Sequence, residues 1–307
     1  MGGPFPVCAQ HESSSNWCLR ESRSFPRIAG MSPLLIAYGL FGLVVGSFLN
    51  VCIHRIPKAE SVVFPGSHCP QCGAKIRPWD NVPVLAYLWL RGRCRDCRAP
   101  ISAQYPAVEL LNGAAWILCA REWGFTAPTY VNSLLLSALL VLFLVDFQHQ
   151  ILPNVVTIPG ALAGVILSPF QSPLLYTDAL TVRLTGALFP ERVEGALPFV
   201  GSLLGAVIGA GILLVVSFVY EKLRKIRGLG LGDVKMMAMV GAFLGWRQAV
   251  LTIFAGSFAG AAIGIVLILF GGRTLQSRMA FGTFLAVGAL LSLFFGPAFY
   301  NWYLATR

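Results

Sequence analysis

Residues 198–220 read PFVGSLLGAVIGAGILLVVSFVY, a stretch without a single charged side chain. A helix of about 20 apolar residues spans the hydrocarbon core of a bilayer, so this stretch predicts a transmembrane helix. The rest of the chain has the same character: 56% of the 307 residues are hydrophobic and only 12% are charged. We therefore predict an all-α polytopic membrane protein, because a soluble domain of this size would carry far more charge.

Hydropathy along the chain predicts about eight transmembrane helices. They lie near residues 33–53, 105–121, 130–146, 155–170, 198–220, 233–246, 249–270 and 281–304. The second is interrupted by Glu109, Asn112 and Gly113, and the sixth is short. We divide the chain into a tail (1–31), a first span (32–53), a polar loop (54–104) and a membrane core (105–307). The tail lacks the apolar centre of a signal peptide, and we expect it to be disordered or to precede a true start at Met31.

Two cysteine pairs, Cys69-x-x-Cys72 and Cys94-x-x-Cys97, lie in the polar loop. This spacing is typical of a four-thiolate zinc site. A redox dithiol and two disulfides are the other interpretations of such pairs. Zinc is favoured because the loop is too short to build its own hydrophobic core and needs another source of stability. Four thiolates leave no coordination position for water, so we predict a structural metal.

Basic residues predict the orientation, because cytoplasmic loops of membrane proteins carry an excess of Lys and Arg. The loops after the first, third, fifth and seventh predicted spans carry fourteen such residues, and the other side carries five without the N-terminal tail. The cysteine loop is therefore expected in the cytoplasm, where thiols stay reduced and available to a metal. The net charge of +10 reflects this bias and indicates no nucleic-acid partner, although the basic loops could touch anionic lipid head groups.

Two aspartates lie near the membrane boundary. Asp146 ends the third predicted span, and Asp233 opens the sixth, directly after the glycine-rich Gly228, Gly230 and Gly232. The predicted topology puts both carboxylates at the cytoplasmic face. Ionisable groups at membrane depth are costly, so they are candidates for function. Asp233 could instead cap its helix, and Asp146 could be an ordinary interfacial residue. The glycines favour a functional role for Asp233, because they allow a closely approached backbone beside it.

A series of motifs follows one another along the chain: Gly46-Ser47-Phe48-Leu49-Asn50-Val51, the paired cysteines, Tyr105-Pro106-Ala107-Val108-Glu109-Leu110, Asp146 followed by Leu152-Pro153, Gly230-Leu231-Gly232-Asp233-Val234-Lys235, and Phe281-Gly282-Thr283-Phe284-Leu285. Together they resemble the type IV prepilin peptidases, bacterial intramembrane aspartic proteases of the GxGD class, over nearly all of residues 34–303, apart from a predicted loop at 171–197. Thr283 stands where that family usually has proline. The resemblance implies that Asp146 and Asp233 are the catalytic pair.

The same resemblance implies that the protein cuts the basic leader from prepilins or pseudopilins at the cytoplasmic side of the bacterial inner membrane. Two carboxylates in a partly desolvated site share one proton, so one acts as general base and the other as general acid. The resemblance also implies methylation of the new N-terminus with S-adenosylmethionine. No glycine-rich cofactor loop in a strand–turn–helix context supports that second activity, and its binding residues stay unassigned.

Five residues are candidates for supporting roles in the site: Gly230, Gly232, Lys235, His149 and Glu109. The Lys235 ammonium would favour an ionised Asp233 if the two met, or it could extend to the membrane interface. His149 follows Asp146 by three residues and could line the site. Glu109 is a candidate for docking the basic leader, as are Asp80 and Glu60, and each could equally be a solvated or interfacial carboxylate.

Two other function classes remain open at this point. A transporter would also bury carboxylates, but it would normally have repeated halves and broken helices near the midplane. A non-catalytic scaffold that binds a pilus-assembly partner through the cysteine loop would need neither aspartate. Glycines at i, i+4, i+8 spacing, such as Gly201, Gly205 and Gly209, predict helix packing and carry no chemistry.

Overall fold

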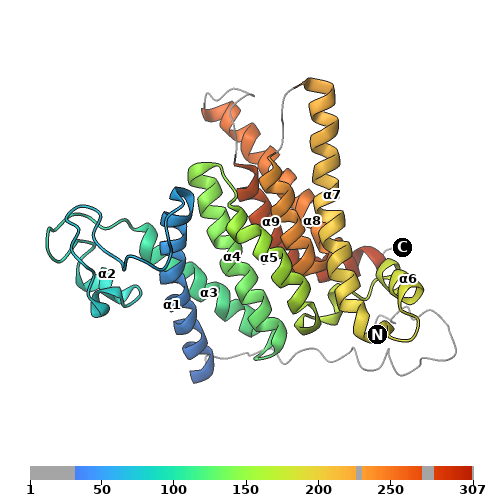
Figure 1. The fold of residues 1–307 in the computed structure, drawn as a ribbon, viewed down its shortest axis with the longest axis horizontal. Coiled ribbons are helices and arrows are strands. Elements are labelled where there is room, and N and C mark those ends of the chain that lie inside the picture. The colour runs from blue at the N-terminus through green and yellow to red at the C-terminus, as the bar shows by residue number, and fades with distance from the viewer. Residues whose placement is uncertain (1–31, 226–229, 272–279, 306–307) are drawn as a thin grey trace.

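The computed structural model describes residues 32–225, 230–271 and 280–305, and within them every extended regular element is a helix (Figure 1). The all-α prediction is confirmed. The bundle consists of α1 (Pro33–Arg55), α3 (Gln104–Trp123), α4 (Ala127–His149), α5 (Asn154–Leu167), α7 (Val193–Arg224), α8 (Leu231–Gly271) and α9 (Phe281–Ala305), with the short helices α2 (Leu85–Trp89) and α6 (Ala179–Leu188) outside it. The predicted tail at 1–31 and Gly228 lie outside the described residues.

Five of these helices are long and apolar enough to cross a membrane: Pro33–Lys58, Ala127–His149, Val193–Leu223, Leu231–Val266 and Phe281–Tyr300. The protein is thus a multi-pass membrane protein, and the count of eight spans stays a prediction. Helix α8 bears on that count, because its 41 residues would reach about 60 Å, twice the thickness of the hydrocarbon core. It is broken at Gly245, where φ is 77°, close to the predicted boundary between the sixth and seventh spans.

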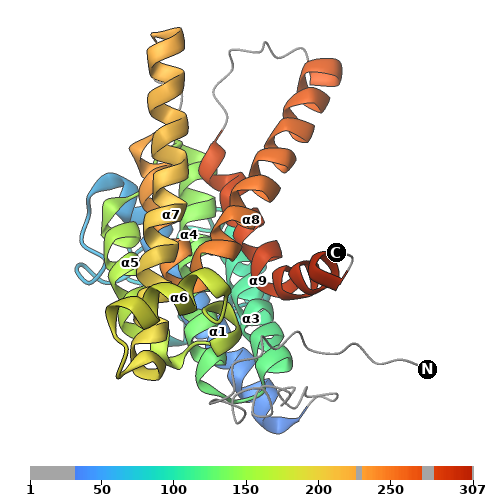
Figure 2. The ribbon, with the colours of Figure 1, turned by 90° about the vertical axis from the view of Figure 1, so that its right-hand side faces the viewer.

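Small residues bring α7 against α8 (Figure 2). A Cβ atom on Gly205 would collide with the carbonyl of Gly241, and one on Gly209 would lie 2.7 Å from the carbonyl oxygen of Met237. Side chains are excluded here because the two backbones approach directly. The packing role predicted for these glycines is confirmed, since Gly205 and Gly209 pack on α8 and a Cβ on Gly201 would meet the side chain of Tyr176.

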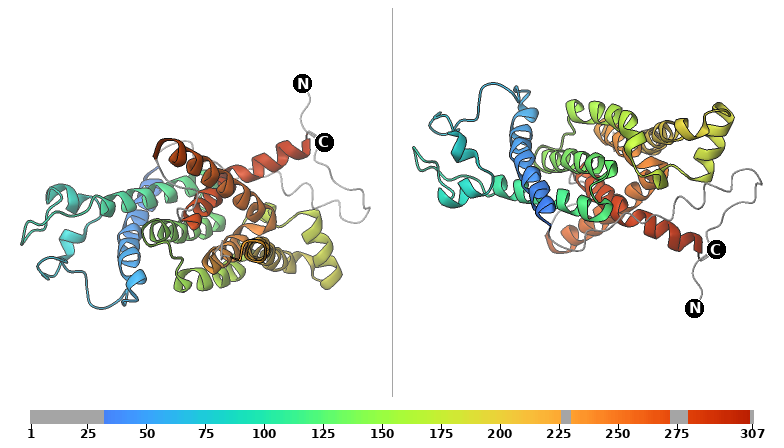
Figure 3. Two further views of the ribbon diagram at one scale, coloured as in Figure 1. Left: turned by 90° about the horizontal axis from the view of Figure 1, so that it is seen from above. Right: turned by 90° about the horizontal axis from the view of Figure 1, so that it is seen from below.

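The polar residues of the second predicted span face the protein interior. The Asn112 side chain donates to the Gly42 carbonyl at 2.7 Å and accepts from the Ser137 hydroxyl at 2.8 Å, which joins α3 to both α1 and α4. Buried polar groups of this kind are stable when they are hydrogen-bonded within the bundle. The cysteine loop, between α1 and α3, extends to one side of these helices (Figure 3).

Candidate active site

Asp146 lies in the last turn of α4 and is only 4% exposed. The helix ends because Gln150 adopts a left-handed conformation with φ of 55°, and its N–H donates to the Asp146 carbonyl at 2.8 Å. This is a common way for a helix to stop. The chain then turns through Leu152 and Pro153 into α5, which leaves the Asp146 carboxylate facing the rest of the bundle.

The first turn of α9 points its donors at the Asp146 carboxylate. Thr283 donates to Asp146 Oδ2 through its backbone N–H at 2.7 Å and through its hydroxyl at 3.2 Å. The backbone N–H of Gly282 lies close enough to add to their electrostatic effect on the same carboxylate. The first N–H groups of a helix have no partner within the helix and carry its positive end, so they form a natural site for an anion.

Asp233 lies in the first turn of α8 and is 8% exposed. Its Oδ2 accepts from the backbone N–H of Gly230 at 3.3 Å, and its own N–H donates to the Gly230 carbonyl at 3.1 Å. A third-position side chain that reaches back to the residue before the helix forms half of a capping box. Asp233 thus takes part in capping its helix, as the simpler interpretation expected, but its carboxylate has a second neighbour.

That neighbour is Asp146, which lies within electrostatic range of the Asp233 carboxylate. The Leu152 side chain packs between the first turns of α8 and α9. A Cβ on Gly232 would lie 2.8 Å from Leu152 Cβ, and a Cβ on Gly282 would lie 2.8 Å from Leu152 Cδ1 and 2.9 Å from Asp146 Oδ2. Glycine at both positions lets the first turns of α8 and α9 pack closely on Leu152, which keeps Asp233 and the donors to Asp146 in one small region. Two acids in one desolvated site share a proton, which equips them for general acid–base chemistry.

The other predicted supporting residues have different surroundings. Lys235 Nζ donates to Asn154 Oδ1 at 2.8 Å and so joins α8 to the start of α5. His149 is exposed at the end of α4. Glu109 is buried in α3 and accepts from the backbone N–H of Val84 at 2.7 Å, which ties the cysteine loop to the bundle.

Of the three carboxylates considered for docking a basic leader, two are engaged within the protein. Glu109 is buried under the loop, and Asp80 accepts two hydrogen bonds from Arg95, Nε to Oδ2 at 2.8 Å and Nη2 to Oδ1 at 2.5 Å. The Arg95 guanidinium holds the pKa of the Asp80 carboxyl below its usual range. Glu60 is exposed on the connection that follows α1.

The two cysteine pairs form matching turns. The N–H groups of Cys69 and Cys94 each donate to the carbonyl five residues later, at 2.9 and 2.8 Å. Their carbonyls accept from the N–H four residues later, at 2.9 and 3.1 Å, where Gly73 and Arg98 adopt φ of 71° and 61°. The segment therefore contains two copies of one turn, each of which presents two cysteine sulfurs to the same cluster.

The four thiols fit a zinc ion. The sulfurs of Cys69, Cys72, Cys94 and Cys97 lie within 4.8 Å of one another, and the Cys69 and Cys97 sulfurs are 3.8 Å apart. Zn–S bonds of about 2.3 Å in a tetrahedron place the sulfurs about 3.8 Å apart. The predicted ligand set is therefore assembled in a geometry that suits a structural metal.

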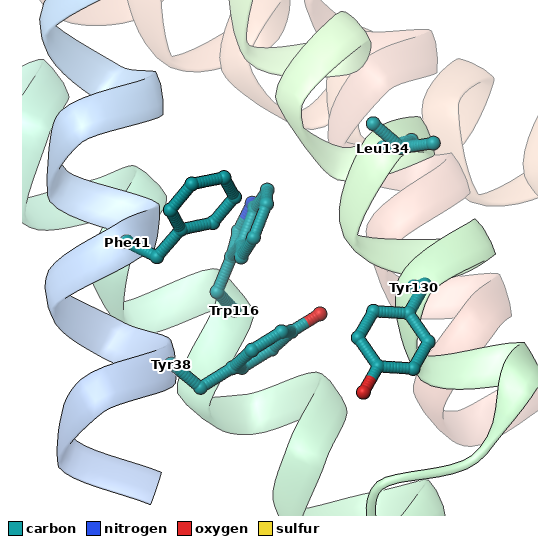
Figure 4. Close-up of a pocket in the computed structure, with 5 residues that line it drawn as sticks. All are labelled: Tyr38, Phe41, Trp116, Tyr130 and Leu134. Carbon is teal, nitrogen blue, oxygen red and sulfur yellow. The ribbon is translucent and has the colours of Figure 1, made fainter. Parts of the chain in front are cut away.

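An apolar recess of about 430 Å³ lies elsewhere in the bundle (Figure 4). It is lined by Tyr38 and Phe41 of α1, Trp116 of α3, and Tyr130 and Leu134 of α4. Tyr130 is sixteen residues before Asp146 on the same helix, which corresponds to about 24 Å. The recess is thus at the far end of α4 and contributes nothing to the acid pair.

Comparisons with known proteins agree with this geometry. Two family models match, the "Bacterial Peptidase A24 N-terminal domain" over residues 40–123 and the "Type IV leader peptidase family" over residues 133–265. Three similar proteins carry the name "Prepilin leader peptidase/N-methyltransferase". The Burkholderia pseudomallei (strain 1026b) protein is 35% identical over 85% of both chains. The Myxococcus xanthus protein is 39% identical over 78% of this chain and 65% of its own. The Pseudomonas aeruginosa protein is 34% identical over 86% of this chain and 91% of its own. No solved structure gives a significant match.

Proposed function

The chain belongs to the type IV leader peptidase family, and from that membership we propose that it removes the leader peptide of prepilins or pseudopilins with Asp146 and Asp233 as its catalytic residues. The observation that carries the assignment of residues is their adjacency. Asp146 on α4 and Asp233 on α8 are buried carboxylates 87 positions apart in the sequence, yet they lie within electrostatic range of each other beside the first turn of α9. No serine or cysteine nucleophile is needed for such a pair to hydrolyse a peptide bond.

In the proposed reaction the ionised carboxylate takes a proton from water as the water oxygen bonds to the scissile carbonyl carbon. The protonated carboxylate gives its proton to the carbonyl oxygen. When the tetrahedral intermediate collapses, the carbon–nitrogen bond breaks, the first carboxyl returns its proton to the leaving amine, and a diol proton restores the second acid. Both carboxylates end as they began, and one water is consumed.

The basic-residue bias supports a cytoplasmic position for the cysteine loop and for the acid pair, at the inner membrane of a bacterium. A prepilin leader is exposed on that side before it is cut, while the apolar segment that follows the cut stays in the lipid bilayer. Glu60, exposed after α1, is the remaining acidic candidate for contact with a basic leader.

The relatives' shared name supports a second activity, transfer of a methyl group to the new N-terminal amine. S-adenosylmethionine is the expected donor, and the residues that bind it stay unassigned. Zinc held by Cys69, Cys72, Cys94 and Cys97 would supply structural cross-linking of the loop, since four thiolates complete its coordination.

The test of the acid pair is cleavage of a full-length prepilin in membranes containing the wild type, Asp146→Asn or Asp233→Asn. Each substitution should reduce cleavage to background at normal protein levels. Asp178→Asn is the matched control, because Asp178 is equally buried but accepts from Leu180, Thr181 and the Thr181 hydroxyl at the start of α6. Cleavage that survives in either site variant would refute the two-aspartate mechanism and would again favour the interpretation as a non-catalytic scaffold.

A further inference from the structure

Asp146 and Asp233 are held by unequal sets of donors. Asp146 receives two hydrogen bonds from Thr283 in the first turn of α9, at 2.7 and 3.2 Å, and the Gly282 N–H is a further donor nearby. Asp233 receives one, from the Gly230 N–H at 3.3 Å. That distance exceeds the usual range for such a bond, so this contact is the weaker. Donors favour the charged form of a carboxylate, and the pair can hold only one charge easily.

Within the part of the chain that the structure describes, few charged groups offset this inequality. Of these, Asp146 acts on Asp233. The Lys235 ammonium is bound to Asn154, and His149 is exposed at the end of α4. Leu152, between the starts of α8 and α9, is apolar. Among the described residues, the difference between the two acids therefore comes from the backbone and hydroxyl donors of α9.

From this geometry we infer that Thr283 is a positioning residue that keeps the shared negative charge on Asp146, so that Asp146 is the general base and Asp233 the general acid. The inference rests on the proposed peptidase function and deepens it. Both Thr283 donors occupy Asp146 Oδ2, so the proton taken from water goes to Oδ1. Asp233 keeps its proton until it gives it to the carbonyl oxygen of the substrate.

Thr283 allows the donors to be removed one at a time. Thr283→Val deletes the hydroxyl but keeps the N–H and the branched shape. Thr283→Pro deletes both donors, and proline is compatible with the first turn of a helix, where the N–H is not used within the helix. Thr283→Ser keeps both donors and is the conservative variant.

The experiment measures kcat and KM for cleavage of a full-length prepilin by the purified, full-length enzyme in lipid vesicles between pH 4 and 10. In a bell-shaped profile of kcat/KM, the acid limb reports protonation of the base and the alkaline limb reports loss of the acid's proton. Thr283→Val should move the acid limb to higher pH by about one unit, a tenfold change in the ionised fraction, because a hydrogen bond to a charged group is lost. Thr283→Pro should move it further, Thr283→Ser should leave it in place, and KM should change little.

Thr185→Val is the matched control. Thr185 is also fully buried and its hydroxyl donates at 2.8 Å, but to Thr181 within α6, away from the acid pair (Figure 1). It should leave both limbs unchanged. If Thr283→Val fails to accumulate, Thr283→Ala makes the same deletion with less steric demand.

Two results would overturn the inference while the peptidase function stands. In one, the Thr283 variants lose rate with the acid limb unmoved, which would reduce Thr283 to a packing residue. In the other, the alkaline limb moves, which would make Asp146 the acid. Absence of cleavage by the wild type would instead be a failure of the proposed function itself.

Discussion

A single methyl group added at Gly282 should lower the rate of catalysis strongly while changing the stability of the fold only modestly. In Gly282→Ala the new Cβ would lie 2.9 Å from Asp146 Oδ2 and 2.8 Å from Leu152 Cδ1, where ordinary contacts are 3.4 Å or longer. The carboxylate or the backbone must therefore yield by about 0.5 Å. A misplacement of about 1 Å costs about a hundredfold in rate, so we expect kcat to fall by about ten- to a hundredfold. Overpacking costs about 1–3 kcal/mol, offset by up to about 1 kcal/mol from the better helix propensity of alanine.

The assay pairs the rate of prepilin cleavage with thermal unfolding of the same purified samples. Gly211→Ala in α7 is the control, because its Cβ would meet nothing within 4 Å and should leave activity unchanged. Leu152→Ala combined with Gly282→Ala removes one of the two close contacts and should recover part of the rate, which a double-mutant cycle measures. A Gly282→Ala enzyme within about twofold of the wild-type rate would refute the close approach of α9 to Asp146.

Three further outcomes are expected. Cys69→Ser should lower the zinc content of the purified protein well below about one ion per chain, as measured by elemental analysis, because a thiolate ligand is lost; full zinc content would argue against the site. Asp80→Asn should speed removal of the metal by a chelator at neutral pH. Because Arg95 lowers the pKa of Asp80, the stabilising effect of the Asp80–Arg95 pair is present above the unfolded pKa of about 4 and is lost as the pH falls through the lower folded pKa. The rates of metal removal from wild type and variant should therefore converge in acid, and a constant difference between them across the pH range would contradict this. Gly205→Val should abolish accumulation of folded protein, because its side chain would enter the backbone of α8, whereas Gly195→Val, with open space around it, should accumulate normally; equal levels of the two would contradict the packing.

The sequence was most informative about the apolar helices. The first predicted span, 33–53, corresponds to α1 at Pro33–Arg55, and the last, 281–304, to α9 at Phe281–Ala305. The predicted separation of spans near 246–249 falls beside the break at Gly245. Hydropathy predicts these helices correctly because a helix in contact with lipid must carry mostly apolar side chains. Hydropathy leaves the number of membrane crossings open, because α3 buries polar side chains and α5 is short. Composition alone does not tell whether such helices cross the membrane.

Features that depend on distant contacts were not predictable in the same way. Helix α6 lies within a segment regarded as a loop, and its start is marked only by Asp178, which accepts from the N–H groups of Leu180 and Thr181. Thr283 was visible as part of a motif, but its partner Asp146 is 137 residues earlier, and no local pattern connects them. Lys235 is close to Asp233 in sequence, yet its ammonium binds Asn154, because a helix turns successive side chains in different directions.

The support of the acid pair by helix termini explains how one carboxylate can stay charged at the edge of a membrane with little help from the cations among the described residues. Basic side chains carry charge at the end of flexible stems, whereas the N–H of Thr283 is fixed by the helix that contains it. Preorganised donors of this kind need no rearrangement when charge develops during the reaction. It follows that removal of the Thr283 hydroxyl alone should weaken the preference of Asp146 for its charged form without abolishing it, since the Thr283 N–H remains. A displacement of the α9 backbone, as in Gly282→Ala, should disturb both Thr283 donors at once and should therefore be the more damaging change.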